Sequence, residues 1–316
     1  MHAIVMTEFG GPEVLKYTEV PDPQRRGRQL LVDVTLAGVN YADRHVAENS
    51  YLKAVDLPYI PGNEVVGVTQ DGRRVIGLTQ GGGYAEKAII HPSLAWEIPD
   101  GVTDEQAVPL ALQGNSAFHI LFTVARVEAG EKILVPAAAG GVGSLAVQLA
   151  AQNGAQVIAL ASTEEKRQLA LDLGAQAAVD SSTIDGLADR VKEAAGGPVN
   201  VALEMTGGQM LQETIATLAP RGRLVLYGFA GGQLEDIPVR TLLQNSITAS
   251  GFWLPSLYTD RRVSLELSTM QLFASVVNGA LKTVSGGSFP LEQAADAHRL
   301  LASRSATGKI SLVTGK

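Results

Sequence analysis

The chain has 316 residues, of which 46% are hydrophobic and 18% charged, so it is a folded globular protein with room for about two domains. Its net charge of −7 argues against a nucleic acid or an anionic membrane surface as a partner, because both bind basic surfaces. It contains no cysteine, which excludes disulfides, thiolate zinc sites and a cysteine nucleophile. We expect a small-molecule substrate and a cytoplasmic location, since the first residues, MHAIVMTEFG, lack the pattern of a secretory signal.

The first 112 or so residues consist of short extended segments bounded by glycine, proline and aspartate. The segment NEVVGVTQDGRRVIGLT places two apolar runs on either side of Asp71–Gly72, a dipeptide that favours a hairpin turn. The segment GRQLLVDVTLAGVN alternates apolar and polar residues in places, as strands with one buried face do. This part of the chain therefore predicts a mainly antiparallel, barrel-like β unit.

From Glu131 onwards, apolar strand patterns alternate with amphipathic helix patterns. Val142, Leu145, Ala146 and Leu149 fall on one helical face, and QVIALA is an uninterrupted apolar run, typical of a parallel strand covered on both faces. The alternation predicts a doubly wound parallel sheet in an α/β fold. Its expected strands are 133–135, 156–161, 177–180, 199–204, 223–228 and 247–252, and its expected helices are 142–153, 164–173, 184–195 and 208–219.

The tail from about Pro255 ends in an amphipathic helix, LEQAADAHRLLAS, and a strand, KISLV. An isolated pair of this kind cannot bury its apolar faces alone, so we expect it to pack on the amino-terminal unit. The expected domains are residues 1–112 together with 254–316, and residues 113–253.

A glycine-rich turn, Ala137-x-x-Gly140-x-x-Gly143, follows the first of the expected parallel strands and begins a helix. Glycines in such a turn let backbone N–H groups approach a pyrophosphate, which the helix N-terminus stabilises electrostatically. The alternatives are a plain glycine-rich turn and a membrane span, and Pro136, the glycines and the later glutamines exclude the span. The sequence of strand, turn, helix and strand favours a dinucleotide, bound by Ala139, Gly140, Gly141, Val142 and Gly143.

The residues after the second strand indicate which dinucleotide binds. An NAD site usually has Asp or Glu there, about 20 residues beyond the glycine turn, to hold the ribose 2′-hydroxyl. This chain has Ser162 and Thr163, which leave room for a 2′-phosphate, and Lys166, which adds positive charge one helical turn later. The pattern predicts NADPH. The alternative is that Glu164 holds the ribose and Lys166 is a solvated helix residue.

Several segments resemble those of zinc-independent quinone oxidoreductases (zeta-crystallin-like proteins) of the medium-chain dehydrogenase/reductase superfamily. They are MHAIVMTEFGGPEVLKY, LAGVNYAD, PYIPGNEVVG, AAAGGVGSLAVQLAAQNGA and HRLLASRSATGKISLV, and they occur in the family's order over essentially the whole chain. The resemblance implies a GroES-like β-barrel catalytic domain split around a Rossmann cofactor domain, and a homodimer.

The chain departs from the zinc alcohol dehydrogenases of that superfamily. Those enzymes carry a cysteine in the segment matching GVNYAD and a histidine in the segment matching PGNE, whereas this chain has Asn40 and Asn63. The amide of asparagine is a poor zinc ligand. We expect no catalytic metal, the alternative being a zinc ion held by His45, Glu64 and His91.

Without a metal, hydride transfer suits a conjugated acceptor, over which the developing charge spreads, better than a simple ketone. The resemblance implies that Asn40 and Tyr51 orient or polarise the acceptor carbonyl, with Asn63 near the substrate and His45 as a candidate proton donor. Each has a structural alternative: Asn40 holds a turn, Tyr51 is an aromatic residue at the rim, and His45 is a partly exposed histidine.

Further cofactor contacts are expected from the resemblance and from the ends of the parallel strands, where ligands gather. Phe252 either walls the site or belongs to a dimer interface, and Arg304 either reaches the 2′-phosphate or lies on the surface. These further expected contacts are Ser116, Gly228, Phe229, Ala230, Phe252 and Arg304.

Together these observations predict an NADPH-dependent, metal-free oxidoreductase that transfers hydride to a conjugated acceptor, and the resemblance implies that this acceptor is a quinone. The same scaffold also reduces 2-alkenals, enones and enoyl thioesters, and the sequence does not separate these acceptors cleanly. A non-catalytic, NADPH-binding crystallin-like protein is an alternative of another class.

Overall fold

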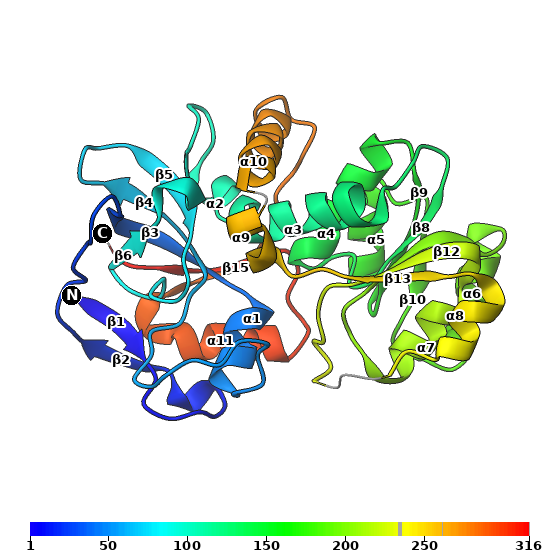
Figure 1. Ribbon diagram of the computed structural model, residues 1–316, viewed down its shortest axis with the longest axis horizontal. Helices are drawn as coiled ribbons and strands as arrows, with labels where there is room; N and C mark the ends of the chain where they lie inside the picture. Colours follow the sequence, from blue (N-terminus) through cyan, green and yellow to red (C-terminus); the bar gives the residue numbers. More distant parts are fainter. Residues whose placement is uncertain (233–235, 261, 316) are drawn as a thin grey trace. The chain divides into compact units, whose positions relative to one another are not determined.

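The computed structural model describes residues 1–232, 236–260 and 262–315 (Figure 1). The chain divides into two compact units: unit 1 is Met1–Asn115 with Ser256–Lys316, and unit 2 is Ser116–Pro255. The boundaries expected from the sequence, after residues 112 and 253, lie a few residues from these positions.

Unit 2 contains a six-stranded parallel sheet in the order β10-β9-β8-β11-β12-β13. The order runs outward in both directions from β8 and β11, so the sheet has a switch point between these two strands, where ligands bind in such folds. The mixed α/β fold, with this parallel sheet and a separate antiparallel one, confirms the fold class expected from the sequence. The strands are β8 (Lys132–Val135), β9 (Gln156–Ala161), β10 (Ala177–Asp180), β11 (Val199–Glu204), β12 (Leu218–Leu226) and β13 (Thr248–Gly251).

The helices of unit 2 follow the strands, as the alternating pattern predicts. Some boundaries differ: the helix expected from residue 184 begins at Leu187, and residues 218 and 219, expected to end a helix, begin β12. Leu218 pairs with Val199 of β11 before a shift in register, so the sheet extends further than the apolar run alone indicates. The helices are α4 (Gly141–Gln152), α5 (Glu164–Asp172), α6 (Leu187–Ala195), α7 (Gly208–Ala216) and α8 (Val239–Asn245).

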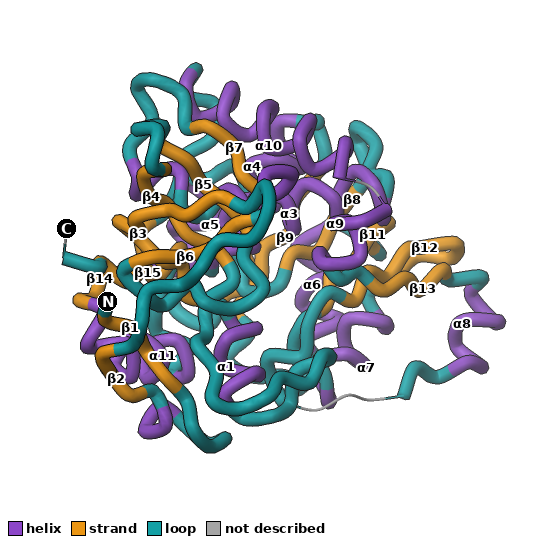
Figure 2. Tube along the Cα trace, turned by 60° about the vertical axis from the view of Figure 1, so that its left-hand side comes forward, coloured by secondary structure: helices purple, strands orange, loops and turns teal. Residues whose placement is uncertain are grey.

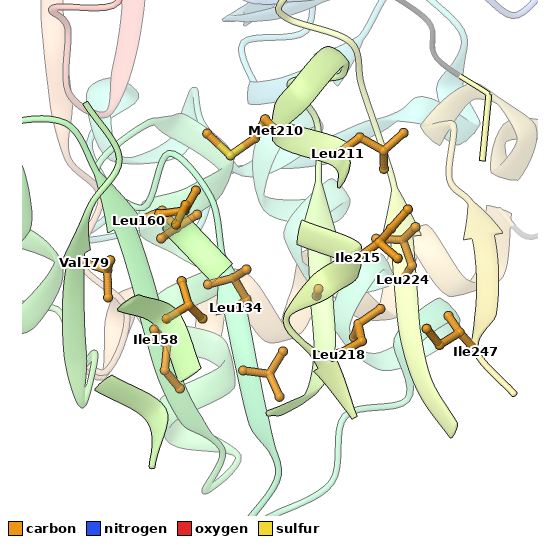
Figure 3. Close-up of a cluster of buried hydrophobic side chains, with 14 residues drawn as sticks. Leu134, Ile158, Leu160, Val179, Met210, Leu211, Ile215, Leu218, Leu224 and Ile247 are labelled. Carbon is orange, nitrogen blue, oxygen red and sulfur yellow. The ribbon is translucent and has the colours of Figure 1, made fainter. Parts of the chain in front are cut away.

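Figure 3 shows a cluster of buried apolar side chains between the parallel sheet and the helices of unit 2. Leu134 and Leu160 of the sheet pack there with Leu211 and Ile215 of α7. Ile133, the neighbour of Leu134 with the opposite orientation, is also fully buried. Both faces of the sheet are therefore covered at its centre, which is why β8 and β9 are nearly continuous apolar runs. Each such side chain contributes about 1.5–3 kcal/mol through burial.

Unit 1 is built around the long strand β3 (Leu30–Val39), which pairs antiparallel with β4 (Glu64–Thr69), β6 (Lys87–Ile90) and β15 (Lys309–Val313) (Figure 2). Ile310 of β15 lies opposite Val39, which confirms that the tail returns to the amino-terminal unit. The other strands of this sheet are β5 (Arg74–Leu78), β7 (Ala95–Glu97) and β14 (Ser285–Pro290). A separate two-stranded sheet is formed by β1 (His2–Val5) and β2 (Lys16–Glu19).

Several helices of unit 1 were not expected from the sequence, and the longest of them is α10. Its apolar residues lie on the exposed side as well as the buried side: Leu265 is fully buried, while 57% of Leu267 is exposed. A helix without a clean apolar face gives no strong periodic signal. The α-helices are α1 (Tyr41–Ala47), α2 (Asp104–Ala107), α3 (Asn115–Phe118) at the unit boundary, α9 (Leu257–Asp260), α10 (Arg262–Val277) and α11 (Ala294–Ala302), with π-helical turns at Leu110–Gly114 and His119–Ala125.

Among the described residues, one continuous helical segment, Asp104–Ala125, is long and apolar enough to cross a membrane. Of its most apolar 18-residue window, 72% is buried inside the protein, as in the core helix of a globular protein.

Candidate active site

The glycine turn of unit 2 lies between β8 and α4, at the switch point of the sheet. The N–H of Gly140 donates to the carbonyl of Ala137 over 2.7 Å, and Ala137 itself has a left-handed φ of 45°. A Cβ on Gly143 would collide with the Ala137 carbonyl, and one on Gly140 would lie only 3.1 Å from the same oxygen. Gly143 is therefore needed for the helix to start so close to the strand, and Gly140 leaves little room for a side chain.

The N-terminus of α4 fits a negatively charged group. Its N-cap, Gly140, forms no side-chain capping bond, and its first turn carries no acidic residue. Ala139 is buried, while Gly140, Gly141 and Val142 are partly exposed, so the first-turn backbone N–H groups meet no competing carboxylate of the helix. Together with the helix dipole, this arrangement suits a dinucleotide pyrophosphate.

Ser162 and Thr163 follow β9 and are exposed. Thr163 is the N-cap of α5 and accepts a hydrogen bond from the N–H of Lys166 over 3.3 Å. Partial burial lowers the pKa of Lys166. Glu164, the alternative ribose ligand, accepts hydrogen bonds from Arg167 at 2.7 and 3.1 Å, so its carboxylate is engaged within the helix.

The loops after β11 and β12 are joined by backbone hydrogen bonds at the carboxyl edge of the sheet. Ala230 donates to the carbonyl of Met205 over 2.6 Å, and Gly231 donates to that of Thr206 over 2.9 Å. Buried Glu204 accepts hydrogen bonds from the N–H groups of Thr206 and Gly207, which fixes the first loop. The expected cofactor residues of this edge lie here: Gly228 is exposed, Phe229 is buried, and Phe252 is partly buried just after β13.

In unit 1, Asn40 lies at the centre of a buried hydrogen-bonded cluster. Its Oδ1 accepts from Lys309 Nζ over 2.9 Å and from Gln113 Nε2 over 3.1 Å. Its Nδ2 donates to Glu64 Oε1 over 2.9 Å and lies 3.4 Å from the Gly38 carbonyl. The amide is thus fully engaged inside the unit. The expected contact of Asn40 with the substrate carbonyl stays a prediction, and these bonds suit a residue that positions its neighbours.

A second buried cluster surrounds Asp43, at the start of α1. Its carboxylate accepts from the N–H of Asn40 over 2.9 Å, from Asn63 Nδ2 over 2.7 Å and from Tyr84 Oη over 3.1 Å. Burial raises the pKa of Asp43 to about 7, although its hydrogen bonds act in the opposite direction. Tyr84 Oη also lies 3.1 Å from Nε2 of His298, whose pKa burial lowers to about 4. Asn63 is therefore held at the edge of a buried polar chain.

The remaining expected residues differ in their surroundings. His45 is buried on α1, not partly exposed, and its Nδ1 lies 2.9 Å from Ser50 Oγ; burial lowers its pKa. Tyr51 is partly buried, and Ser116 is buried on α3. Arg304 is exposed after α11, in unit 1, with a left-handed φ of 57°. Its expected contact with a 2′-phosphate stays a prediction.

Sequence reasoning missed most of the unit 1 clusters. It considered Glu64 only as a zinc ligand, and it did not single out Asp43, Gln113 or Lys309. The sequence does contain one signal for the ion pair: each of the two apolar strands EVVGV and KISLV begins with a charged residue. Such charges are seldom buried unless they are paired.

The donor atoms of unit 1 do not fit a zinc ion. Lys309 places an ammonium group against both Glu64 and Asn40, and a cation already occupies that position. His91, from the alternative zinc set, is exposed and accepts from the N–H of Ser93. Within residues 1–232, 236–260 and 262–315, no group of three or more His, Cys, Asp or Glu side chains could hold a metal ion.

Comparisons with known proteins agree with this architecture. Residues 141–270 match the family model described as "Zinc-binding dehydrogenase". The chain is 34% identical to quinone oxidoreductase-like protein 2 of Rattus norvegicus, over 98% of this chain and 91% of that protein. It is 30% identical to the quinone oxidoreductase of Homo sapiens, over 99% and 98% of the two chains.

Solved structures extend the likeness to three dimensions. The Escherichia coli quinone oxidoreductase complexed with NADPH superimposes with a TM-score of 0.93 at 27% identity, covering 99% of this chain and all of that one. The quinone oxidoreductase of Thermus thermophilus, also solved with NADPH, gives 0.86 at 32% identity over 99% and 100%. The chain is thus an oxidoreductase of the medium-chain dehydrogenase/reductase superfamily. Within it, the chain belongs to the quinone oxidoreductase family.

Proposed function

We propose that the protein is an NADPH-dependent reductase of quinones. The observation that carries the proposal is the glycine turn at the switch point of a parallel sheet, in a chain similar over 99% of its length to quinone oxidoreductases solved with NADPH. Bound NADPH would supply the hydride. The backbone of Gly140, Gly141 and Gly143 would hold its pyrophosphate, and Ser162, Thr163 and Lys166 its 2′-phosphate.

The side chains of unit 1 would bind and orient the acceptor. Tyr51 and Asn63 are the proposed donors to its carbonyl oxygens, while Asn40 keeps the surrounding backbone in place. Hydride addition to a quinone spreads negative charge over the ring and the second oxygen, so fixed hydrogen-bond donors are sufficient to stabilise it. The ammonium of Lys309 lies against Asn40 and Glu64, two residues of the sites considered for zinc, which supports a reaction without a metal.

The test is steady-state oxidation of NADPH and NADH with four acceptors: a benzoquinone, phenanthrenequinone, a 2-alkenal and an enoyl thioester. The expected result is the highest kcat/KM with NADPH and a quinone, unchanged after treatment with a chelator. A higher kcat/KM for the 2-alkenal or the thioester would refute the quinone assignment. Stoichiometric zinc in active protein would refute the metal-free reaction.

We also propose that the protein is a homodimer that pairs through β13. This strand is at the edge of the parallel sheet, and the neighbouring helix α8 has no buried residue, with 76% of Leu243 and 65% of Val239 exposed. An unpaired edge beside exposed apolar side chains favours association. Light scattering of the native protein and of Ala249→Pro, which removes an N–H from the edge strand, tests this: the variant should be monomeric.

For location we propose the cytoplasm, with a small molecule as the binding partner and neither nucleic acid nor a membrane. The net charge of −7 supports the absence of polyanionic partners. Cell fractionation, together with a gel-shift at low salt, tests these two points.

A further inference from the structure

The buried cluster of unit 1 leaves one polar atom without a partner. Gln113 lies in the π-helical turn Leu110–Gly114 and is 8% exposed. Its Nε2 donates to Asn40, but no group among the described residues donates to its buried Oε1. π-Helical turns are frequent at functional sites, and a buried acceptor without a donor costs about 1–3 kcal/mol.

The ion pair of Lys309 and Glu64 determines the orientation of the Gln113 amide through Asn40, which contacts all three residues. The ammonium of Lys309 can only donate and the carboxylate of Glu64 accepts, so Asn40 must turn Oδ1 to Lys309 and Nδ2 to Glu64. Gln113 must then present its NH₂ to Asn40 Oδ1, because the flipped amide would set two acceptors against each other. The free atom of the cluster is therefore an acceptor and not a donor.

An acceptor distinguishes the products of the candidate reactions. A quinone takes up a hydride and one proton and becomes a hydroquinone, whose two oxygens both carry hydrogen. A 2-alkenal or an enoyl thioester takes up the same hydride and proton but gains two C–H bonds and no hydroxyl. A fixed acceptor therefore stabilises reduced quinones, which donate, more than the oxidised form, which only accepts.

We propose that Gln113 Oε1 accepts a hydrogen bond from the hydroxyl group formed on the quinone, and that Gln113 thereby selects quinones as the substrate class. The inference rests on the proposed function and names a residue that determines its specificity. Hydrogen bonds through Asn40 and Asp43 connect Gln113 to the proposed substrate residue Asn63, which is why the donor is assigned to the substrate and not to the cofactor.

The experiment measures inhibition constants of hydroquinone and 1,4-dimethoxybenzene against the quinone, for the native protein and Gln113→Met. Methylation removes both donors and keeps the ring. The native protein should bind hydroquinone more tightly than the ether, and Gln113→Met should reduce that preference about fivefold, the effect of one net hydrogen bond. Gln148→Met, which removes another buried glutamine whose Nε2 donates to Ser144, should keep the native preference.

Gln113→Ala replaces Gln113→Met if the methionine variant does not fold, as judged by circular dichroism and NADPH affinity. An unchanged preference for the hydroxyl in the folded variant would overturn the proposal, since Oε1 would then bind only an internal water molecule. A loss confined to NADPH affinity, measured by calorimetry, would also overturn it. If the native protein reduces quinones and the preference is unaffected, this inference fails while the proposed function stands.

Discussion

Lys309 Nζ and Glu64 Oε1 form an ion pair whose side chains are 3% and 0% exposed, between the first residues of β15 and β4. Space for the pair comes from Gly38, where a Cβ would lie 2.6 Å from Cε of Lys309. Glu64 Oε2 also accepts from the N–H of Leu112 over 3.0 Å. The pair thus joins three segments of unit 1 that are far apart in the sequence.

Lys309→Met should destabilise unit 1 by about 3–5 kcal/mol, because it leaves the Glu64 carboxylate buried without its cation. The double variant Lys309→Met/Glu64→Leu removes both charges and should recover most of this loss. Urea unfolding followed by circular dichroism measures the three free energies of unfolding. If the single and double variants had equal free energies of unfolding, the loss in Lys309→Met would not come from an unpaired Glu64 carboxylate.

Asn40→Ala should lower kcat roughly tenfold to a hundredfold and leave NADPH affinity nearly unchanged. The substitution removes the acceptor of Lys309 and Gln113 and the donor to Glu64, so the groups around the acceptor molecule shift from their productive positions. Steady-state kinetics with a saturating quinone, together with NADPH titration, separate the two effects. If cofactor affinity falls as far as kcat, Asn40 acts on the cofactor and not on the substrate.

Gly143→Ala should weaken NADPH binding about tenfold or more. The new methyl group meets the Ala137 carbonyl, and overpacking of this kind costs about 1–3 kcal/mol in the backbone that receives the pyrophosphate. Gly251→Ala is the matched control, since its Cβ would meet no atom within 4 Å. Fluorescence titration with NADPH compares the two variants, and equal affinities would show that the turn tolerates a side chain.

Lys166→Ala should raise KM for NADPH about tenfold and change KM for NADH little, because only NADPH has a 2′-phosphate to pair with an ammonium group. Arg167→Ala is the control. Arg167 is already paired with Glu164 at 2.7 Å and with Asp180 at 3.2 Å, so its loss should affect both cofactors alike. An unchanged ratio of the two KM values in Lys166→Ala would exclude this lysine from the phosphate site.

His298→Gln should alter the dependence of stability on pH between 4 and 6.5. Burial lowers the pKa of His298 from 6.5 to about 4, so in this range the unfolded chain binds a proton that the folded protein does not. In the native protein, the free energy of unfolding is therefore not reduced by His298 above pH 6.5. As the pH drops to 4, protonation of His298 in the unfolded chain lowers this free energy by about 3 kcal/mol.

Asp43 changes the free energy of unfolding in the opposite direction. Because its pKa is raised to about 7, its contribution to stability is lost as the pH rises. The measured quantity is therefore the difference in unfolding free energy between native protein and His298→Gln at each pH. A difference that stays constant from pH 4 to 7 would show that His298 is not held in its neutral form.

The sequence predicts unit 2 well because its signals are local. The strands β8, β9 and β11 are mostly apolar runs that are buried on both faces, and Gly143 is required by a backbone contact within a few residues. Pro136 stops β8 at Val135, as expected from its missing N–H. The helices between the strands are the crossover connections that parallel pairing requires.

The clusters of unit 1 were beyond sequence reasoning because their contacts are distant. Asn40 meets Lys309 across 269 positions of the chain, and Tyr84 meets His298 across 214. Periodicity describes which face of an element is apolar, but it does not indicate which polar groups meet when strands such as β3 and β15 pair. The family resemblance identified Asn40 as a site residue, and only the coordinates reveal that its amide is fully occupied.

The interruption of unit 1 by unit 2 imposes an order on synthesis. Unit 2 is one continuous stretch, whereas residues 36–39 of β3 receive their β15 partner only after all of unit 2 has been translated. Until then this part of β3 has an open edge and Glu64 has no cation. An open strand edge in a nascent chain promotes aggregation, so a chaperone that shields it during this interval would improve the yield of native protein.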